Sequence, residues 1–286
     1  MTDNGNNPDM TVVLPASNRL RASGPILILA ILFVVGSFLA WYFTWFGRGL
    51  SDADISQYLV DEKHPRHVQH ALLQIQQRIE KGDRNATQWY PQILSLTGNP
   101  ETEFRLTVAW LMGFDNKSNE FHQALLKLVN DPEPIVRRNA ALALVRFNDS
   151  SGRSELLATL SPYELKAPAE GTVASTLKEG SALARGTLVG RITQTDQKTV
   201  EVRSPLPGKV ARLLATSGSS VVSGAGMLTI NSDEDSVWEA LRGLAIVGNV
   251  SDLSAVDRYA QSVEPVTERI KEQATLTAKS IRSRVQ

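Results

Sequence analysis

Apolar residues recur at three- and four-residue spacing through most of residues 51–162, which predicts amphipathic helices that each bury one stripe. Two blocks are alike. "ETEFRLTVAWLMGFDN" begins at 101 and "PEPIVRRNAALALVRFND" begins at 132, and they align with an offset of 33. Each is followed by a polar turn and a second apolar helix, at 119–129 and 152–160. A pair of helices with one open apolar face must stack on its neighbours, so the pattern predicts a helical repeat array.

The same pattern resumes in residues 234–286. "SVWEALRGLAIVGNVSD" (236–252) matches the second block with an offset of 102, and "EPVTERIKEQATLTAKSIRSR" (264–284) starts a further unit. A period of about 33 residues accounts for only part of that offset. The remainder predicts an insertion of about seventy residues between two repeats.

The block "DPEPIVRRNAALALVRFND" (131–149) resembles the HEAT repeat family in its Asp-Pro start, its Val136-Arg137-Arg138 stretch and its small Ala140-Ala141 pair. Small side chains let paired helices approach closely, and proline suits the first turn of a helix. The resemblance implies an α-solenoid with an extended surface that binds protein partners.

Residues 163–232 have a different pattern, rich in glycine, proline and β-branched residues. "KAPAEGTVASTLKEGSALARGTLVGRI" (166–192) parallels "RSPLPGKVARLLATSGSSVVSGAGMLTI" (203–230), so that Gly171 aligns with Gly208. Strands separated by glycine turns in two similar halves predict a small β-sandwich with approximate two-fold symmetry.

The two halves meet at "TDQKTVEVRSP" (195–205), which resembles the central hairpin of biotinyl and lipoyl domains. In that family a lysine directly after a Thr-Asp pair carries the cofactor. Here Gln197 occupies that position and Lys198 follows it. An amide cannot form the acyl-lysine linkage, and one step along a strand reverses the direction of the side chain. We therefore expect a lipoyl-like fold without an attached cofactor, with Lys198 as the weak alternative attachment site.

A charge-free apolar stretch covers residues 25–46 and predicts a transmembrane helix, because it would be about 33 Å long. Residues 1–24 are predicted to be a disordered tail. Arg19 and Arg21 precede the span and Arg48 follows it, so the positive-inside rule favours a cytoplasmic N-terminus and a periplasmic body. The expected fold class is multidomain α and β: a single transmembrane helix and a HEAT-like solenoid interrupted by a lipoyl-like β-sandwich.

The composition excludes several classes of binding and catalytic site. Thirty basic residues balance thirty acidic residues, which gives no general attraction to nucleic acid. The chain has no cysteine, so it has no disulfide, thiolate metal ligand or cysteine nucleophile. "HPRHVQH" spaces His64, His67 and His70 three residues apart, just after Asp61 and Glu62. These imidazoles are weak metal candidates, and a solvated first helical turn is the simpler interpretation.

No catalytic motif or cofactor site is predicted, so the chain is expected not to be an enzyme. The favoured function is a membrane-anchored scaffold or accessory subunit of a membrane complex, of an envelope transport or respiratory electron-transfer type. Its expected partners are integral-membrane proteins, with no nucleic acid. The alternatives are a periplasmic adaptor of a transport system and a lipoyl or biotinyl carrier. Fold alone does not choose among them.

Overall fold

The computed structural model describes residues 24–41, 49–261 and 266–284 of the chain, which forms two units, 1–49 and 50–286. The described residues of the first unit are Gly49 and helix α1 (Gly24–Trp41), in which the large hydrophobic side chains from Ile26 to Leu39 are exposed. The predicted tail lies outside the described residues except for Gly24, and so does the aromatic end of the predicted span, residues 42–46.

The transmembrane prediction needs correction. Within the ranges that the structure describes, no helix combines the length and the apolar character needed to cross a membrane. By that measure the predicted span over 25–46 is wrong, and so are the single-pass fold class and the membrane localisation with a periplasmic body.

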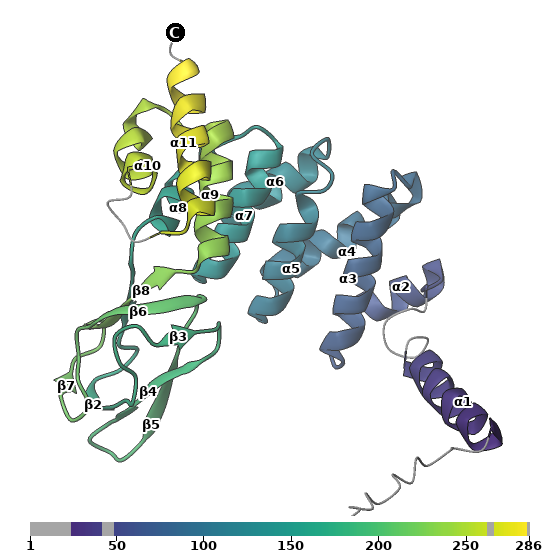
Figure 1. Cartoon of the computed structure of the whole chain (residues 1–286), viewed down its shortest axis with the longest axis horizontal. Coiled ribbons are helices and arrows are strands. Elements are labelled where there is room, and N and C mark those ends of the chain that lie inside the picture. The colour runs from purple at the N-terminus through teal and green to yellow at the C-terminus, as the bar shows by residue number, and fades with distance from the viewer. Residues whose placement is uncertain (1–23, 42–48, 262–265, 285–286) are drawn as a thin grey trace, which may run out of the picture. The chain divides into compact units, whose positions relative to one another are not determined.

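The second unit is a row of helices interrupted by strands (Figure 1). Its first helices are α2 (Asp52–Leu59), α3 (Pro65–Glu80), η2 (Arg84–Trp89), α4 (Tyr90–Ser95), η3 (Leu96–Gly98), α5 (Thr102–Met112), α6 (Asn119–Leu128), α7 (Pro134–Arg146), η4 (Ser150–Gly152) and α8 (Arg153–Thr159). After the strands come α9 (Glu234–Val247), η5 (Val250–Asp252), α10 (Leu253–Ala260) and α11 (Glu268–Ser283).

The leading helices of successive repeats pack side by side: α3 on α5, α5 on α7, α7 on α9 and α9 on α11. Helix α9 also packs on α8, so the array continues across the strands that separate α8 from α9 in sequence. Small residues permit this stacking. A Cβ on Gly152 would lie 2.6 Å from the Cα of Ala141, and a Cβ on Gly243 would lie 2.9 Å from Leu156 Cδ1. Close backbone approach is the role that glycine plays in both places.

Two arginines at equivalent positions of successive repeats each bond an equivalent pair of backbone carbonyls and one acidic side chain. Arg105 Nη1 donates to the carbonyls of Asn99 and Pro100, while its Nε donates to Asp131 Oδ2 at 2.7 Å. Thirty-two residues on, Arg137 Nη1 donates to the carbonyls of Asp131 and Pro132. The acid partner differs, because Arg137 Nε reaches Glu155 of α8 at 3.1 Å. The change of partner comes immediately before the inserted strands.

The strands form two four-stranded antiparallel sheets, with orders β1-β8-β6-β3 and β5-β4-β2-β7. Each sheet therefore combines strands from both halves of the segment. The strands are β1 (Tyr163–Lys166), β2 (Gly171–Ala174), β3 (Ala182–Leu183), β4 (Leu188–Thr193), β5 (Thr199–Arg203), β6 (Gly208–Leu213), β7 (Ser220–Val221) and β8 (Gly226–Ser232). Their apolar side chains meet in one core that includes Val173, Ile192, Val210 and Ile230.

The two halves repeat each other down to single hydrogen bonds. Gly180 N donates to Val210 O, and Gly218 N donates to Val173 O, both at 2.8 Å. Gly171 and Gly208 are a second matched pair, with φ of +147° and +153° at the start of β2 and β6. A Cβ on either would collide with the carbonyl oxygen of the neighbouring strand, at 2.4 Å and 2.1 Å. Only glycine fits at these two crossings.

Both ends of the strand segment join the helices at one place. Ser232 Oγ donates to Thr159 O at 2.8 Å, which ties the exit of β8 to the end of α8. Arg138 of α7 is buried beside this junction, 3.9 Å from Glu155, and its Nε and Nη1 have no hydrogen-bond partner among the described residues. Burial lowers the pKa of this guanidinium. Farther out, Arg185 between β3 and β4 pairs with Glu103 of α5, so the strand segment also contacts the array away from its junction.

Candidate functional sites

A groove of about 390 Å³ opens on the face made by the leading helices α5, α7 and α9. We call it the repeat groove; its lining residues are Trp110, Asn139, Leu142, Ala143, Val145, Arg146, Glu239, Arg242, Gly243 and Ile246. Two large apolar side chains at its edges are exposed, Trp110 by 40% and Ile246 by 52%. The lining carries two arginines and one glutamate, so it has a net positive charge.

Aromatic rings hold the two groove arginines. The Arg146 guanidinium lies 4.2 Å from the centre of the Phe114 ring, and Trp110 meets that ring edge-on at 4.7 Å. The Arg242 guanidinium lies 4.5 Å from the centre of the Trp238 ring. Tryptophan and arginine are enriched among the residues that dominate protein–protein binding energy. Because stacking fixes both guanidinium groups before any partner arrives, little side-chain freedom remains to be lost on binding.

The hairpin between β4 and β5 contains the position at which the lipoyl-domain resemblance implies an attachment lysine. Gln197 N donates to Gln194 O at 3.0 Å, and Gln197 has φ of +64°. Lys198 follows the turn, and its ammonium pairs with Asp196 Oδ2 at 2.8 Å. The side chain of Lys198 is 78% exposed. The turn therefore places a left-handed glutamine where the resemblance implies a modified lysine.

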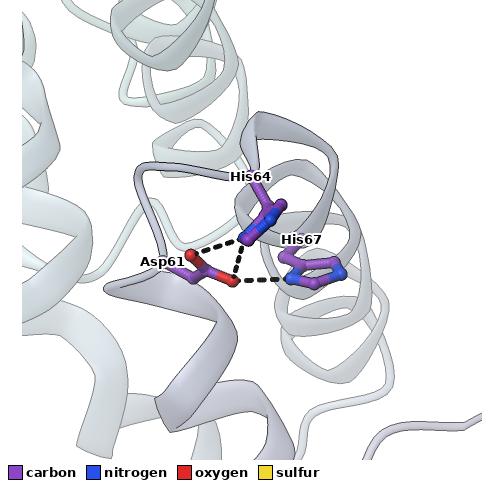
Figure 2. Close-up of side chains that lie close together, drawn as sticks. All are labelled: Asp61, His64 and His67. Atoms are coloured by element: carbon purple, nitrogen blue, oxygen red, sulfur yellow. Dashed lines mark hydrogen bonds and ion pairs between the residues drawn. The ribbon is translucent and has the colours of Figure 1, made fainter.

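Asp61, His64 and His67 converge where the turn after α2 meets the first turn of α3, as Figure 2 shows. His67 Nδ1 lies 2.7 Å from Asp61 Oδ2, and His64 Nδ1 lies 2.9 Å from both carboxylate oxygens. Local backbone geometry explains the convergence. His64 N donates to Asp61 O, and His67 N donates to His64 O. Successive three-residue turns of this kind bring side chains at i and i+3 onto one line.

His70 lies outside this cluster, although the sequence pattern grouped it with His64 and His67. His67 and His70 both lie in α3, but His70 bonds a glutamine of that helix and not Asp61. Its Nε2 lies 3.0 Å from Gln74 Nε2, while Gln74 Oε1 accepts from Leu50 N at 2.7 Å. The glutamine amide must then donate to His70, which uses the lone pair of His70 Nε2. Burial and the neighbouring His67 lower the pKa of His70.

Aromatic packing and charge fix the cluster. Tyr58 of α2 stacks on His67 with ring centres 4.3 Å apart. Hydrogen bonds from His67 and His64 lower the pKa of the Asp61 carboxyl, which favours its charged form. His64 is the N-cap residue of α3 but makes no capping hydrogen bond, because its imidazole turns towards Asp61.

Sequence reasoning missed two features. Asp61 was noticed only as an upstream acid, and the signal that could have placed it was its three-residue spacing from His64. The repeat groove was not predicted residue by residue, because Trp110, Arg146 and Ile246 come from three helices. The repeat offset of 33 carries position 110 onto 143, which also lines the groove, so the alignment could have placed these positions on one face.

The comparisons with known proteins support one part of the fold. The HEAT repeat family model matches residues 123–150, most of α6, all of α7 and the start of η4, which confirms a HEAT repeat there. No curated protein matches the chain. A solved structure described as a single-chain, multi-domain long-chain acyl-CoA carboxylase aligns with 36% of this chain and 9% of its own, at 18% identity and a TM-score of 0.24. At that TM-score the likeness carries no argument about fold or activity.

Proposed function

We propose that this chain is a non-catalytic scaffold that binds a protein partner in the repeat groove. The observation that carries the proposal is the pair of exposed apolar side chains, Trp110 and Ile246, flanking arginines that aromatic rings already hold in place. HEAT repeats generally mediate protein–protein interactions, and the family match on 123–150 includes the α7 wall of the groove.

The groove chemistry defines the partner. Apolar contact at Trp110 and Ile246 suits a large hydrophobic side chain, and Arg146 and Arg242 suit a carboxylate next to it. The partner segment we propose therefore carries an apolar residue beside an acidic residue. Only a short segment fits a groove of this size, so a larger partner would gain affinity from further contacts along the array.

The first test identifies the partner and then measures its affinity. A photo-crosslinking amino acid at position 142, in the groove, is expected to capture one protein from native extracts at stoichiometric yield. With that protein purified, Trp110→Ala and Ile246→Asp are each expected to weaken binding at least about tenfold, because fully desolvated interface anchors contribute about 2 kcal/mol or more.

Val250→Asp is the matched control for Ile246→Asp. Val250 is 50% exposed, close to the 52% of Ile246, but it lies in η5 outside the groove. The control variant is expected to bind with unchanged affinity. Equal affinities for all the variants and the unchanged chain would overturn the groove as the binding site.

In this function the lipoyl-like segment carries no covalently attached lipoyl or biotinyl group. Support comes from Gln197 at the family attachment position and from the ion pair that engages Lys198 with Asp196. Intact mass of the chain, produced in cells that lipoylate and biotinylate their own proteins, is expected to equal the sequence mass. The host's modified proteins serve as the internal control. An added lipoyl or biotinyl mass that disappears in Lys198→Arg would make the chain a carrier.

A further inference from the structure

We propose that Asp61, His64 and His67 form a binding site for a divalent transition-metal ion of the zinc type. The three potential ligand atoms lie within 4.8 Å of one another, and they combine one carboxylate oxygen with two imidazole nitrogens. Zinc accepts this donor set, and three protein ligands with water in the fourth position are a known arrangement.

The geometry needs only a small adjustment to accept an ion. Tetrahedral ligands about 2.0–2.1 Å from zinc are separated from one another by about 3.3 Å. Asp61 Oδ2 now lies 2.7 Å from His67 Nδ1 and 2.9 Å from His64 Nδ1. Widening these two separations by about half an ångström would bring them to the zinc value, and the two imidazole ligand atoms lie within 4.8 Å of each other. All three nitrogen and oxygen atoms already point towards that space (Figure 2).

The imidazole tautomers allow both rings to become ligands. Each imidazole now donates its Nδ1 proton to the carboxylate. A neutral imidazole carries its proton on one ring nitrogen, so it can hold that proton on Nε2 and leave Nδ1 as the ligand atom. The side chain of His64 is 65% exposed and that of His67 is 42% exposed, so solvent can take part in this exchange. The charged Asp61 carboxylate then faces the ion instead of two N–H groups.

The surroundings hold the ligands in place. Tyr58 stacks on His67 and fixes the plane of that ring. His64 occupies the N-cap position of α3, where Ser, Thr, Asp or Asn would usually accept a hydrogen bond from the helix. The His64 side chain makes no such bond. Its ring nitrogen faces the Asp61 carboxylate instead, at 2.9 Å from both oxygens. An ion here would join the end of α2 to the start of α3, at the first helix pair of the array.

The test uses the full chain and Co²⁺ as a coloured probe, with Zn²⁺ as competitor. We expect a saturable visible absorption from bound Co²⁺ that Zn²⁺ removes, together with a rise in melting temperature with added Zn²⁺. His67→Ala and Asp61→Asn are each expected to weaken Co²⁺ binding at least about tenfold, since even indirect partners of metal ligands change affinity by about 10–100-fold.

Two variants serve as controls. His122→Ala removes a histidine–aspartate pair, His122 with Asp149 at 2.6 Å, that gathers no third ligand from the described part of the chain. His70→Ala removes the neighbouring histidine that bonds Gln74. Both are expected to bind Co²⁺ as the unchanged chain does. Absence of saturable absorption, or equal absorption in His67→Ala and Asp61→Asn, both checked for native helix content, would overturn the site and leave a metal-free hydrogen-bonded turn.

Discussion

Gly208→Ala is expected to destabilise the β-sheets by about 3 kcal/mol or more, the largest effect we predict for a single added methyl group. Two costs combine. A non-glycine residue at φ of +153° is strained by about 1–3 kcal/mol. The added Cβ would also stand 2.1 Å from Asn231 O on the neighbouring strand, and relieving such a contact costs about 1–3 kcal/mol more. Hydrogen exchange of the β6 and β8 amides, which pair with each other, measures the loss directly.

Gly224→Ala separates the cost of backbone strain from the cost of the close contact with the neighbouring strand. Gly224 also has a positive φ, +84°, but a Cβ added there would meet nothing within 4 Å, so only backbone strain of about 1–2 kcal/mol applies. Gly171→Ala is expected to behave like Gly208→Ala, since its Cβ would lie 2.4 Å from Thr193 O. If Gly208→Ala and Gly224→Ala lose the same stability, the close strand crossing does not carry the effect.

Asp131→Ala is expected to lower the free energy of unfolding of the helical array by about 3–5 kcal/mol. Asp131 and Arg105 are nearly buried, with 5% and 11% of their side chains exposed, and the pair is bidentate at 2.7 and 3.1 Å. Removing one member of a buried pair leaves the other charge without compensation. Asp131 Oδ1 also accepts from Glu133 N at 2.8 Å, next to the start of α7, and that bond is lost too. Urea unfolding followed by circular dichroism measures the change.

Arg191→Ala is the surface control. Arg191 and Glu201 pair at 3.0 Å on the sheet, but their side chains are 53% and 39% exposed, so removal is expected to cost about 0–1 kcal/mol. A double variant, Arg105→Met with Asp131→Leu, should regain much of the stability that Asp131→Ala loses, because an apolar pair leaves no buried charge. A loss for Asp131→Ala as small as that for Arg191→Ala would contradict a structural role for the arginine link between repeats.

Features that depend on internal repetition could be predicted from the sequence. The alignment of Gly171 with Gly208 follows from two parallel halves, and both residues have nearly the same φ. The HEAT resemblance of 131–149 lies within the stretch that the family model matches. Repetition is informative because a residue that recurs at equivalent positions is under the same backbone constraint each time.

Other features could not be predicted from hydrophobic pattern and residue spacing alone. The apolar run at 25–46 predicted a membrane span, but no helix in the described residues is long and apolar enough to cross a membrane. Helical spacing grouped His70 with His64 and His67, whereas the turn before α3 substitutes Asp61. The acid partner of Arg137 is Glu155 of α8, because the strands begin where the next repeat would otherwise have started.

The strand segment enters and leaves the helical array at one place, so it is an insertion that the array can accommodate without a break in its stack. Its entry at the end of α8 and its exit into α9 are tied together by the bond from Ser232 to Thr159, and α9 packs directly on α7 and α8. A chain in which a short loop replaces the strands would therefore keep an unbroken stack of helices. Such a position suits the insertion of a module, because its two chain ends meet, and removing the strands would also remove the pair that Arg185 makes with Glu103. One solenoid could thus have carried different attachments while its own groove stayed the same.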